Sequence, residues 1–382
     1  MNTFHCQNCG HPIFFENVRC LKCSSDLAFL PDRMAMSPIE PAEPAEDGTP
    51  LWRPRLRPRK RASTARYRLC HNNAAYQACN FAVPQDDPNP LCVSCRQTRV
   101  LPDLAQPDNI QRWYRIEVAK RRLFYTLAKM GLLDPTPPHG ERDGPVFEFL
   151  ADQPGQQVMT GHAQGLITLN VAEADDTERV RRRIEMHEPY RTLLGHLRHE
   201  SGHFYWDHLV APFPERLERF RELFGDERQD YAQALHAHYA SGGQPANWQD
   251  NYVSAYATAH PWEDWAETWA HYLHMVDLLE TAASYHTRLT VPGTESDVED
   301  VINPLETGSP DFDTLVDQWV PVTLLVNSLN RSLGQEDAYP FALSVNALRK
   351  LRFVHDTIGD KRKEQVAADA KDAKDPNKGT AA

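Results

Sequence analysis

The clearest pattern in the chain is a helical repeat of apolar residues that starts at about Asn109. In the stretch WYRIEVAKRRLFYTLAKMGLL, apolar side chains recur three and four residues apart, so they fall close to one face of a helix. These residues are Ile116, Leu123, Phe124, Leu127 and Met130. We therefore predict an amphipathic helix that buries this face.

Two segments after this helix have the composition of strands. VFEFLAD (residues 146–152) and GLITLNVAE (residues 165–173) are separated by a polar loop that contains glycine. From there to about Ile358 the pattern predicts mostly helices. Residues 359–382 are polar and charged and hold no aromatic side chain, so we expect a disordered tail.

The first hundred residues follow a different pattern. Residues 1–30 and 67–105 each hold four cysteines, and we expect a zinc ribbon in the first and a second zinc-binding module in the second. The proline-rich segment 31–66 between them is predicted to be a linker with one strand near Trp52. Residues 106–358 would form a mostly helical domain with a small sheet, so the expected fold class is α+β.

Composition and charge limit the number of domains, the location and the partners that we expect. The 382 residues suffice for two or three domains, and no apolar run approaches the roughly 18–20 residues of a membrane-spanning helix. The start, MNTFHCQNCG, lacks the basic and apolar regions of a secretion signal, so we expect a cytoplasmic protein without a membrane partner. The formal net charge of −12 argues against nucleic acid as a partner, because such binding needs a basic surface.

One local exception is the basic stretch WRPRLRPRKRASTARYR at residues 52–68. It is either a solvated basic linker or a nucleic-acid-binding patch, and the sequence leaves both interpretations open.

The first four cysteines are regularly spaced. Cys6, Cys9, Cys20 and Cys23 follow the pattern C-x2-C-x10-C-x2-C, and two such pairs supply the four thiolates of a tetrahedral zinc site. Disulfides and a redox-active pair are the alternatives. The expected cytoplasmic location disfavours the first, and the lack of a surrounding βαβ pattern disfavours the second.

The second four cysteines are less regular. Cys70, Cys79, Cys92 and Cys95 follow C-x8-C-x12-C-x2-C, and the turn-rich segment PQDDPNP could bring the two halves together. We predict a second zinc site here, with four reduced core cysteines as the alternative. Both sites would have four protein ligands and no open position, as structural zinc sites do.

A cluster of histidines lies in GHLRHESGHFYWDHL, which contains the pattern HExxH. On a helix, His199 and His203 face the same side and can bind one metal ion, and Glu200 lies where it can take a proton from water beside the metal. Gly202 costs a helix about 1 kcal/mol relative to alanine, which suggests that a close neighbour requires a small residue there. A chance match on a surface helix is the alternative, and His196 is a weaker candidate ligand.

Two histidines leave zinc short of a third protein ligand. The stretch HPWEDWAETWAHYLHMVDLL predicts a helix with Pro261 in its first turn. Glu263 and Glu267 are four residues apart and face one side, so one can bind zinc while the other hydrogen-bonds a ligand histidine. A plain charged helix face is the alternative.

The chain resembles the family of zinc-binding metallopeptidases that carry an N-terminal zinc-ribbon domain. The similar stretches cover most of residues 4 to 285: CQNCGHPIFFENVRCLKC, CNFAVPQDDPNPLCVSCRQTR, GLITLNVAEADDTERVR, EPYRTLLGHLRHESGHFYWDHL, ELFGDERQDYAQALHAHY and HPWEDWAETWAHYLH. The resemblance implies a zincin-like metallopeptidase domain at residues 106–358. It also implies that an edge strand, for which we expect GLITLNVAE, pairs with a peptide substrate, with an ordinary core hairpin as the alternative.

The same resemblance assigns roles to the site residues. It implies zinc on His199 and His203, with Glu200 as the catalytic base. In glutamate-zincins the third ligand lies four residues before an acidic residue that supports the site, which maps onto Glu263 as ligand and Glu267 as its support or the alternative ligand. The chain departs from the thermolysin-type arrangement in one respect: 59 residues, a longer spacing, separate His203 from Glu263. This spacing admits an inserted helical pair at roughly residues 215–239.

The function we expect is a zinc-dependent hydrolase, a metallopeptidase with one catalytic and two structural zinc ions. Its substrate would be a peptide or protein, and the ribbons could bind a protein partner. Tyr256, His260 and His271 are candidates to stabilise the oxyanion. The alternatives are an interaction module on a catalytically silent scaffold and a hydrolase that acts on a non-peptide bond.

Overall fold

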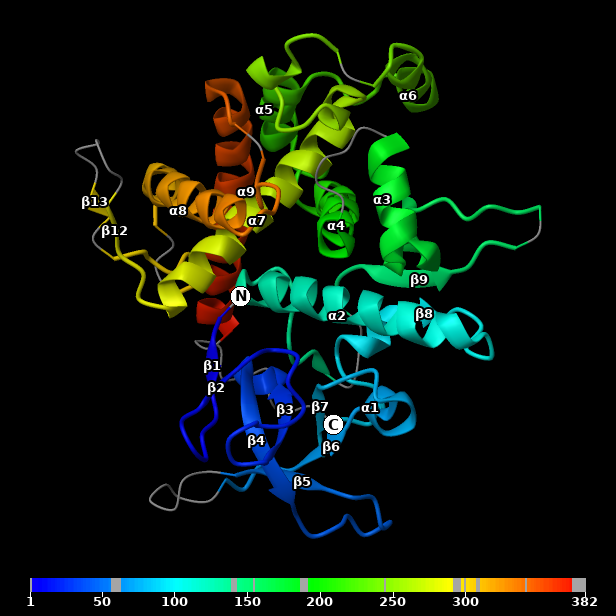
Figure 1. Cartoon of the computed structure of the whole chain (residues 1–382), viewed down its shortest axis with the longest axis vertical. Helices are drawn as coiled ribbons and strands as arrows, with labels where there is room; N and C mark the ends of the chain where they lie inside the picture. Colours follow the sequence, from blue (N-terminus) through cyan, green and yellow to red (C-terminus); the bar gives the residue numbers. More distant parts are fainter. Residues whose placement is uncertain are drawn as a thin grey trace.

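The N-terminal part of the chain is built from strands, and the rest is mostly helical (Figure 1). The computed structural model describes residues 2–55, 63–138, 143–153, 155–185, 192–243, 245–290, 297–298, 300–306, 310–340 and 342–372. The chain is a mixed α+β protein, so the predicted fold class is confirmed. No helix in these ranges is long and apolar enough to cross a lipid bilayer.

The N-terminal part contains a five-stranded antiparallel sheet with the strand order β3-β4-β5-β6-β7. Its strands are β3 (Asp26–Leu30), β4 (Ala35–Pro41), β5 (Trp52–Pro54), β6 (Tyr67–Leu69) and β7 (Ala82–Pro84). The short strands β1 (Phe4–His5) and β2 (Pro12–Ile13) pair beside it, and the helix α1 (His71–Tyr76) follows β6.

The segment expected to be a linker takes part in this sheet. Residues 31–66 contain β4 as well as the strand at Trp52 that we expected. Strand β4 forms because its two faces both bury apolar side chains: Met36 joins the main core and Ile39 joins a smaller cluster. Residues 56–62 of the basic stretch lie outside the described residues, and the expected domain boundaries stay predictions.

The second sheet has the strand order β10-β11-β9-β8. Its strands are β8 (Thr98–Val100), β9 (Val146–Leu150), β10 (Gly161–Ala163) and β11 (Leu166–Asn170). Strand β9 runs parallel to β8 and β11, and β10 runs antiparallel to β11. The two predicted strands are therefore β9 and β11, whereas β8 and β10, only three residues long, were not predicted.

The order of strands corrects one expectation. Strand β11 was expected at the edge of the sheet, but it lies between β9 and β10. Among the described residues β10 pairs only with β11, so β10 is the edge strand on the side of the helix α4. A further small pair consists of β12 (Leu289–Thr290) and β13 (Asp297–Val298).

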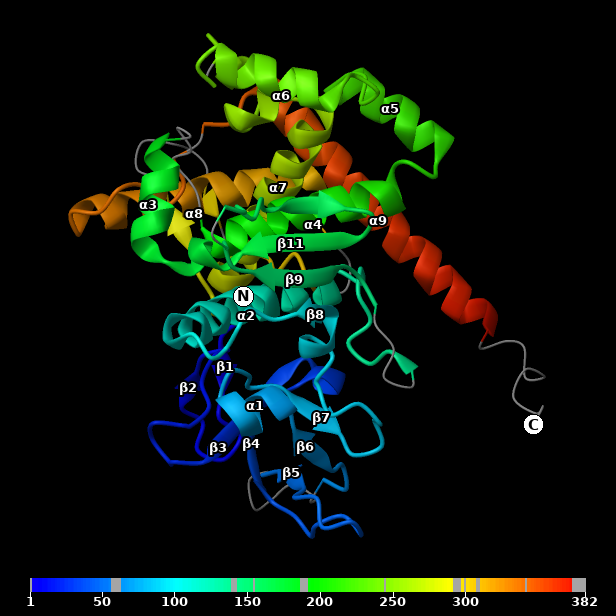
Figure 2. The same ribbon diagram turned by 90° about the vertical axis from the view of Figure 1, so that its right-hand side faces the viewer.

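Long helices cover the second sheet (Figure 2). The remaining helices are α2 (Pro107–Lys129), α3 (Asp176–Glu185), α4 (Leu193–Leu209), α5 (Pro214–Phe224), α6 (Tyr231–Ala240), α7 (Pro261–Ser284), α8 (Phe312–Ser332) and α9 (Val345–Asp372). All five residues predicted for the apolar face of α2 are buried, and the last of them, Met130, directly follows the helix. Helices α5 and α6 are the predicted insertion between His203 and Glu263.

The C-terminal segment differs in part from the expectation. Residues 359–372, predicted as the start of a disordered tail, continue α9. Residues 373–382 lie outside the described residues.

The strands and the helices share a core. Phe15 and Phe29 of the N-terminal part pack against Tyr125 of α2, with ring centroids 5.6 and 6.2 Å apart. Helix α2 lies between the N-terminal strands and the other helices in both views (Figures 1 and 2). Burial of these aromatic rings between α2 and the N-terminal strands therefore joins the two parts of the chain.

Helices α4 and α7 cross closely in the centre of the molecule. A Cβ atom at Gly202 of α4 would lie only 2.9 Å from the Cα atom of Ala266 in α7. The indole N–H of Trp265 donates to the carbonyl of Gly202 at 2.8 Å, and that of Trp269 donates to the hydroxyl of Ser201 at 3.1 Å. The glycine of the histidine motif thus allows the two helices to approach.

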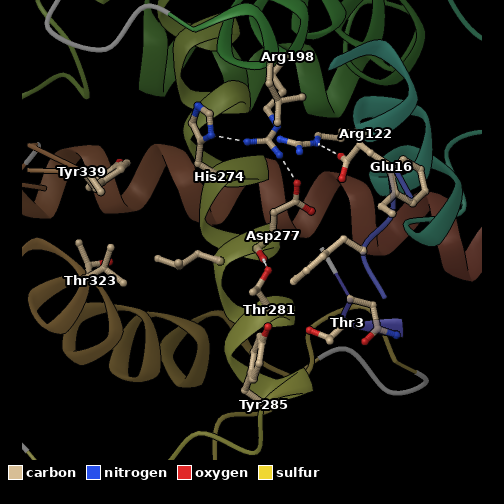
Figure 3. A pocket seen from close by; sticks show the side chains of 17 residues that line it. Thr3, Glu16, Arg122, Arg198, His274, Asp277, Thr281, Tyr285, Thr323 and Tyr339 are labelled. Carbon is tan, nitrogen blue, oxygen red and sulfur yellow. Dashed lines mark hydrogen bonds and ion pairs between the residues drawn. The ribbon is translucent and has the colours of Figure 1, made fainter. Parts of the chain in front are cut away.

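Charged side chains tie the same two helices together one turn earlier on α4. Arg198 of α4 donates to Asp277 and to His274, both on α7; Arg198 and Asp277 are buried and His274 is partly buried (Figure 3). They line a cavity of about 520 Å³ between the N-terminal part and helices α2, α4, α7 and α8. Arg122 of α2 pairs with Glu16 across this cavity at 2.5 Å.

Candidate functional site

The first half of the candidate site is the middle of α4. The helix begins after Thr192, whose hydroxyl accepts a hydrogen bond from the N–H of Gly195 at 2.9 Å. Its regular spacing brings His199 and His203 onto one side, and both side chains are buried. The two histidines therefore face α7 and the edge of the second sheet as a pair.

The second half is the first turn of α7. Pro261 begins this helix, and the imidazole of His260 caps it by accepting a hydrogen bond from the N–H of Trp262 at 3.1 Å. This cap fixes the first turn and holds Glu263, only 1% exposed, against the histidines of α4.

Three ligand atoms converge where the two helices meet. Nε2 of His199 lies 3.0 Å from Oε2 of Glu263, and Nε2 of His203 lies 3.4 Å from Oε1 of the same carboxylate. The potential ligand atoms of the three residues all lie within 4.8 Å of one another. Nitrogen and oxygen ligands of tetrahedral zinc, bound at about 2.0–2.1 Å, are roughly 3.4 Å apart, so these separations fit a zinc ion.

The buried carboxylate has an incomplete set of partners. Oε2 of Glu263 is buried and accepts no well-aligned hydrogen bond from the described residues. Burial raises the pKa of Glu263, but the neighbouring His203 and His199 outweigh burial and lower it well below its usual range. A buried ionised carboxylate whose two oxygens each lie beside an imidazole nitrogen is a group that a divalent cation would complete.

Glu267 contacts the other side of His199. Nδ1 of His199 donates to Oε1 of Glu267 at 2.7 Å, and the hydroxyl of Ser254 donates to Oε2 at 2.6 Å. Burial raises the pKa of Glu267, but the bond from His199 outweighs it and lowers the pKa to about 2. Because Nδ1 carries the hydrogen in this bond, Nε2 is left with the lone pair that can bind a metal.

Glu200 lies on α4 beside these groups. It is 4% exposed, and its Oε1 lies 3.4 Å from Nε2 of His196. Burial raises the pKa of Glu200, but the contact with His196 and the charges of His199 and His203 outweigh burial and lower it. The carboxylate is therefore ionised at neutral pH and able to accept a proton.

Aromatic side chains close the site on two sides. The indole of Trp262 packs on the ring of His203 with 3.8 Å between centroids. His162 of β10 lies 6.1 Å from both of these rings, so the edge strand runs beside the candidate metal ligands. The sequence analysis did not find His162, because β10 is too short to be recognised from its pattern.

The three residues proposed from the sequence for oxyanion stabilisation have different surroundings. The ring of Tyr256 lies 5.9 Å from that of His199, which keeps it a candidate. His260 is the N-cap of α7, and His271 is buried and contacts the hydroxyl of Tyr339, so these two have structural contacts.

A tyrosine that was not predicted from the sequence contacts one of the candidate ligands directly. The hydroxyl of Tyr231, in the inserted helix α6, donates to Oε1 of Glu263 at 2.7 Å. Its side chain is also 41% exposed, so it can meet a substrate. The long insertion separates it from both motifs in sequence, and only the fold brings it to the site.

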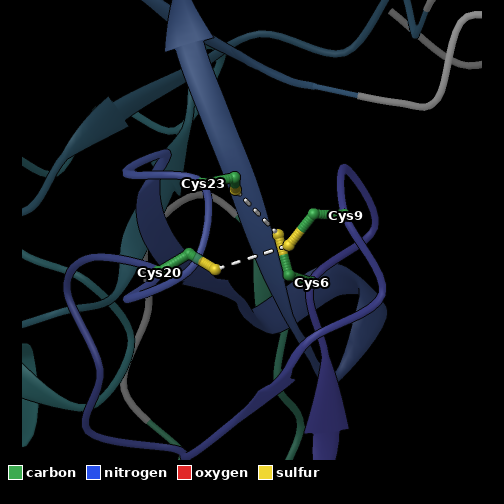
Figure 4. A group of neighbouring side chains, drawn as sticks. All are labelled: Cys6, Cys9, Cys20 and Cys23. Atoms are coloured by element: carbon green, nitrogen blue, oxygen red, sulfur yellow. Dashed lines mark hydrogen bonds between the residues drawn. The ribbon is translucent and has the colours of Figure 1, made fainter.

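The eight cysteines form two separate groups, each with the membership expected from the sequence. In the first group Sγ of Cys6 lies 3.7 Å from that of Cys23, and Sγ of Cys9 lies 3.7 Å from that of Cys20 (Figure 4). Sulfur atoms at the corners of a zinc tetrahedron with bonds of about 2.3 Å are roughly 3.8 Å apart, whereas a disulfide is about 2.05 Å long. All eight cysteines are free thiols, so the disulfide alternative is excluded and the spacing fits zinc.

The second group is fully buried. Sγ of Cys79 lies 3.6 Å from that of Cys92, and the N–H of Cys92 donates to Sγ of Cys70. Backbone donors of this kind stabilise thiolates, which is the form that binds zinc.

Known protein families match both parts of the chain. Residues 109–357 match the family described as "Putative zinc-binding metallo-peptidase", and residues 3–106 match a zinc-ribbon domain. Uncharacterized proteins of Mycobacterium tuberculosis (strain ATCC 25618 / H37Rv) and Mycobacterium bovis (strain ATCC BAA-935 / AF2122/97) are 41% identical over 364 residues, 94% of this chain and 96% of each relative. No solved structure matches the chain.

Proposed function

The chain belongs to the "Putative zinc-binding metallo-peptidase" family, and we propose from the geometry of its histidine site that it is a zinc-dependent hydrolase that cleaves peptide bonds. The observation that carries this proposal is the convergence of His199, His203 and Glu263 beside the buried carboxylate of Glu200. Three protein ligands leave a fourth position open, as catalytic zinc sites do.

His199, His203 and Glu263 would hold the ion, with Glu267 fixing the ring of His199 through its Nδ1–H. When bound, zinc would lower the pKa of a water molecule to about 7 and polarise the carbonyl under attack. The hydrogen bonds that Glu267 accepts support Glu263, rather than Glu267, as the direct ligand, because both oxygens of Glu267 are already occupied at 2.7 and 2.6 Å.

Glu200 is the proposed general base and acid. Its carboxylate would accept the proton of the attacking water and then donate it to the nitrogen of the leaving amine. Its lowered pKa keeps the carboxylate ionised, which the first role requires. Tyr231 is the proposed donor to the oxyanion, because its hydroxyl already reaches Glu263 and its side chain is open to solvent.

An extended peptide would bind along β10. The free edge of this strand offers backbone N–H and C=O groups, and its His162 lies beside the rings of His203 and Trp262. A peptide that pairs with this edge would pass the three ligand atoms.

The two cysteine groups are proposed as structural zinc sites. Each offers four thiols, which would fill a tetrahedral shell and leave no position for a substrate. Their role would be to hold the loops of the N-terminal part, which has few long strands.

Digestion of a broad peptide library by the zinc-loaded chain tests the proposal. We expect new peptide ends, and we expect Glu200→Gln to bind zinc as wild type does while its rate falls about 100- to 10,000-fold. A wild-type chain that holds zinc in the histidine site but cleaves no peptide would instead support the silent-scaffold alternative. Equal rates for wild type and Glu200→Gln would exclude this glutamate as the base.

A further inference from the structure

A second buried carboxylate lies close to the candidate site without taking part in metal binding. Glu173 belongs to the short 3-10 helix η4 (Val171–Ala174), which directly follows strand β11, and it is only 1% exposed. Burying a carboxylate is unfavourable unless hydrogen bonds or charges compensate, so its partners show what it does.

Both oxygens of Glu173 are engaged. The hydroxyl of Thr160 donates to Oε1 at 2.7 Å, and Nδ1 of His196 lies 2.5 Å from Oε2. Thr160 directly precedes strand β10, and its own oxygen accepts a hydrogen bond from the N–H of Asn170. Glu173 is therefore fixed to the edge of the second sheet.

His196 connects this carboxylate to the proposed base. It lies on α4 one turn before His199, and its Nε2 is 3.4 Å from Oε1 of Glu200. The ring thus stands between two carboxylates, with one nitrogen directed at each. A carboxylate that holds one nitrogen of an imidazole fixes the orientation and hydrogen position of the ring.

We propose that Glu173 and His196 are positioning residues for Glu200, an inference that rests on the proposed function of Glu200 as the base. Glu173 holds the ring of His196 by its Nδ1–H. Between two carboxylates the ring carries a hydrogen on both nitrogens, as an imidazolium, so its Nε2–H donates to Oε1 of Glu200. The carboxylate of Glu200 is thereby kept in the orientation in which its other oxygen meets the attacking water. Because Thr160 adjoins β10, the same chain of contacts joins the proposed peptide-binding strand to the base.

The kinetic test compares His196→Ala and His196→Gln with wild type and with His286→Gln, a histidine on the surface after α7. For both His196 variants we expect kcat to fall about 10- to 100-fold while KM and zinc content stay close to wild type, and the melting temperature should fall because buried Glu173 loses a partner. His286→Gln should match wild type. Unchanged kcat in a folded, zinc-loaded His196 variant would overturn the proposal, and His196→Gln serves this purpose if His196→Ala does not fold.

Nuclear magnetic resonance of the ring nitrogens gives a readout that needs no substrate. In the zinc-loaded chain we expect a slowly exchanging Nδ1–H signal from His196 that is lost in Glu173→Gln, because the amide is a poorer acceptor. A His196 signal like that of exposed His286 would overturn the proposal, whatever the activity. Failure of the peptide digestion with an intact His196 signal would refute the proposed peptidase and leave the geometry of the histidine supported.

Discussion

Replacing Gly202 by alanine should disturb both the packing and the metal site. Gly202 lies in the middle of α4, and a Cβ atom there would lie 2.9 Å from the Cα of Ala266 and 3.2 Å from two side-chain atoms of Trp269. Real Cβ atoms almost never come within 3.0 Å of another heavy atom. Since the closest atom belongs to a helix backbone and Trp269 is fully buried, the two helices must separate.

Two effects of opposite sign determine how much Gly202→Ala changes the free energy of unfolding. Alanine is favoured over glycine inside a helix by about 1 kcal/mol, whereas overpacking a core costs about 1–3 kcal/mol. Because the clash involves the backbone of α7, we expect the upper part of that range and a net loss of about 1–2 kcal/mol. Separation of α4 from α7 also moves His199 and His203 away from Glu263, so the affinity for zinc should fall.

Urea unfolding followed by tryptophan fluorescence measures the change in stability. Zinc competition against a chelator measures the change in zinc affinity. The matched control is Gly359→Ala in α9, where no atom lies within 4 Å of the added Cβ and a gain of up to about 1 kcal/mol is expected. If Gly202→Ala were as stable as wild type and bound zinc as tightly, the close crossing of the helices would not be what requires the glycine.

Three further predictions concern charged and metal-binding side chains. Lys350→Met should lower the free energy of unfolding by about 3–5 kcal/mol, because Nζ of Lys350 lies 2.5 Å from the buried carboxylate of Asp264, and adding Asp264→Asn should restore part of the loss. Glu263→Ala should abolish tight zinc binding at the histidine site, whereas Glu267→Ala should weaken it about 10- to 100-fold, and the reverse order would exchange their roles. Burial lowers the pKa of His355 below its ordinary value of 6.5, so the unfolded chain binds the proton more readily and stability should fall as the pH drops below that value. Melting temperatures between pH 5 and 7 should show a smaller fall for His355→Gln, and an unchanged fall would contradict this argument.

The parts of the site that lie within one helix could be predicted from the sequence. The four-residue spacings of His199 with His203 and of Glu263 with Glu267 depend only on helical geometry. Both pairs lie on predicted helices, and the fold brings the two helices together. Even the need for a small residue at Gly202 followed from the poor helix propensity of glycine.

Features that depend on long-range pairing could not be predicted in this way. Tyr231 comes to the site from an inserted helix, and Glu173 reaches His196 from the far end of a strand. Strand β10 has three residues and no periodicity, so it is visible only through its pairing with β11. Segment 31–66 suggested a linker because of its prolines, whereas the burial of Met36 and Ile39 makes part of it a strand.

Anomalous diffraction from crystals of the zinc-loaded chain, measured on both sides of the zinc absorption edge, tests the central claim most directly. We expect three zinc peaks: one within each group of four cysteines and a third bound by Nε2 of His199, Nε2 of His203 and a carboxylate oxygen of Glu263. Mild chelation before data collection should remove the third peak first, because its shell has an open position. Absence of that third peak from fully loaded crystals, or a peak held by Glu267 in place of Glu263, would contradict the account.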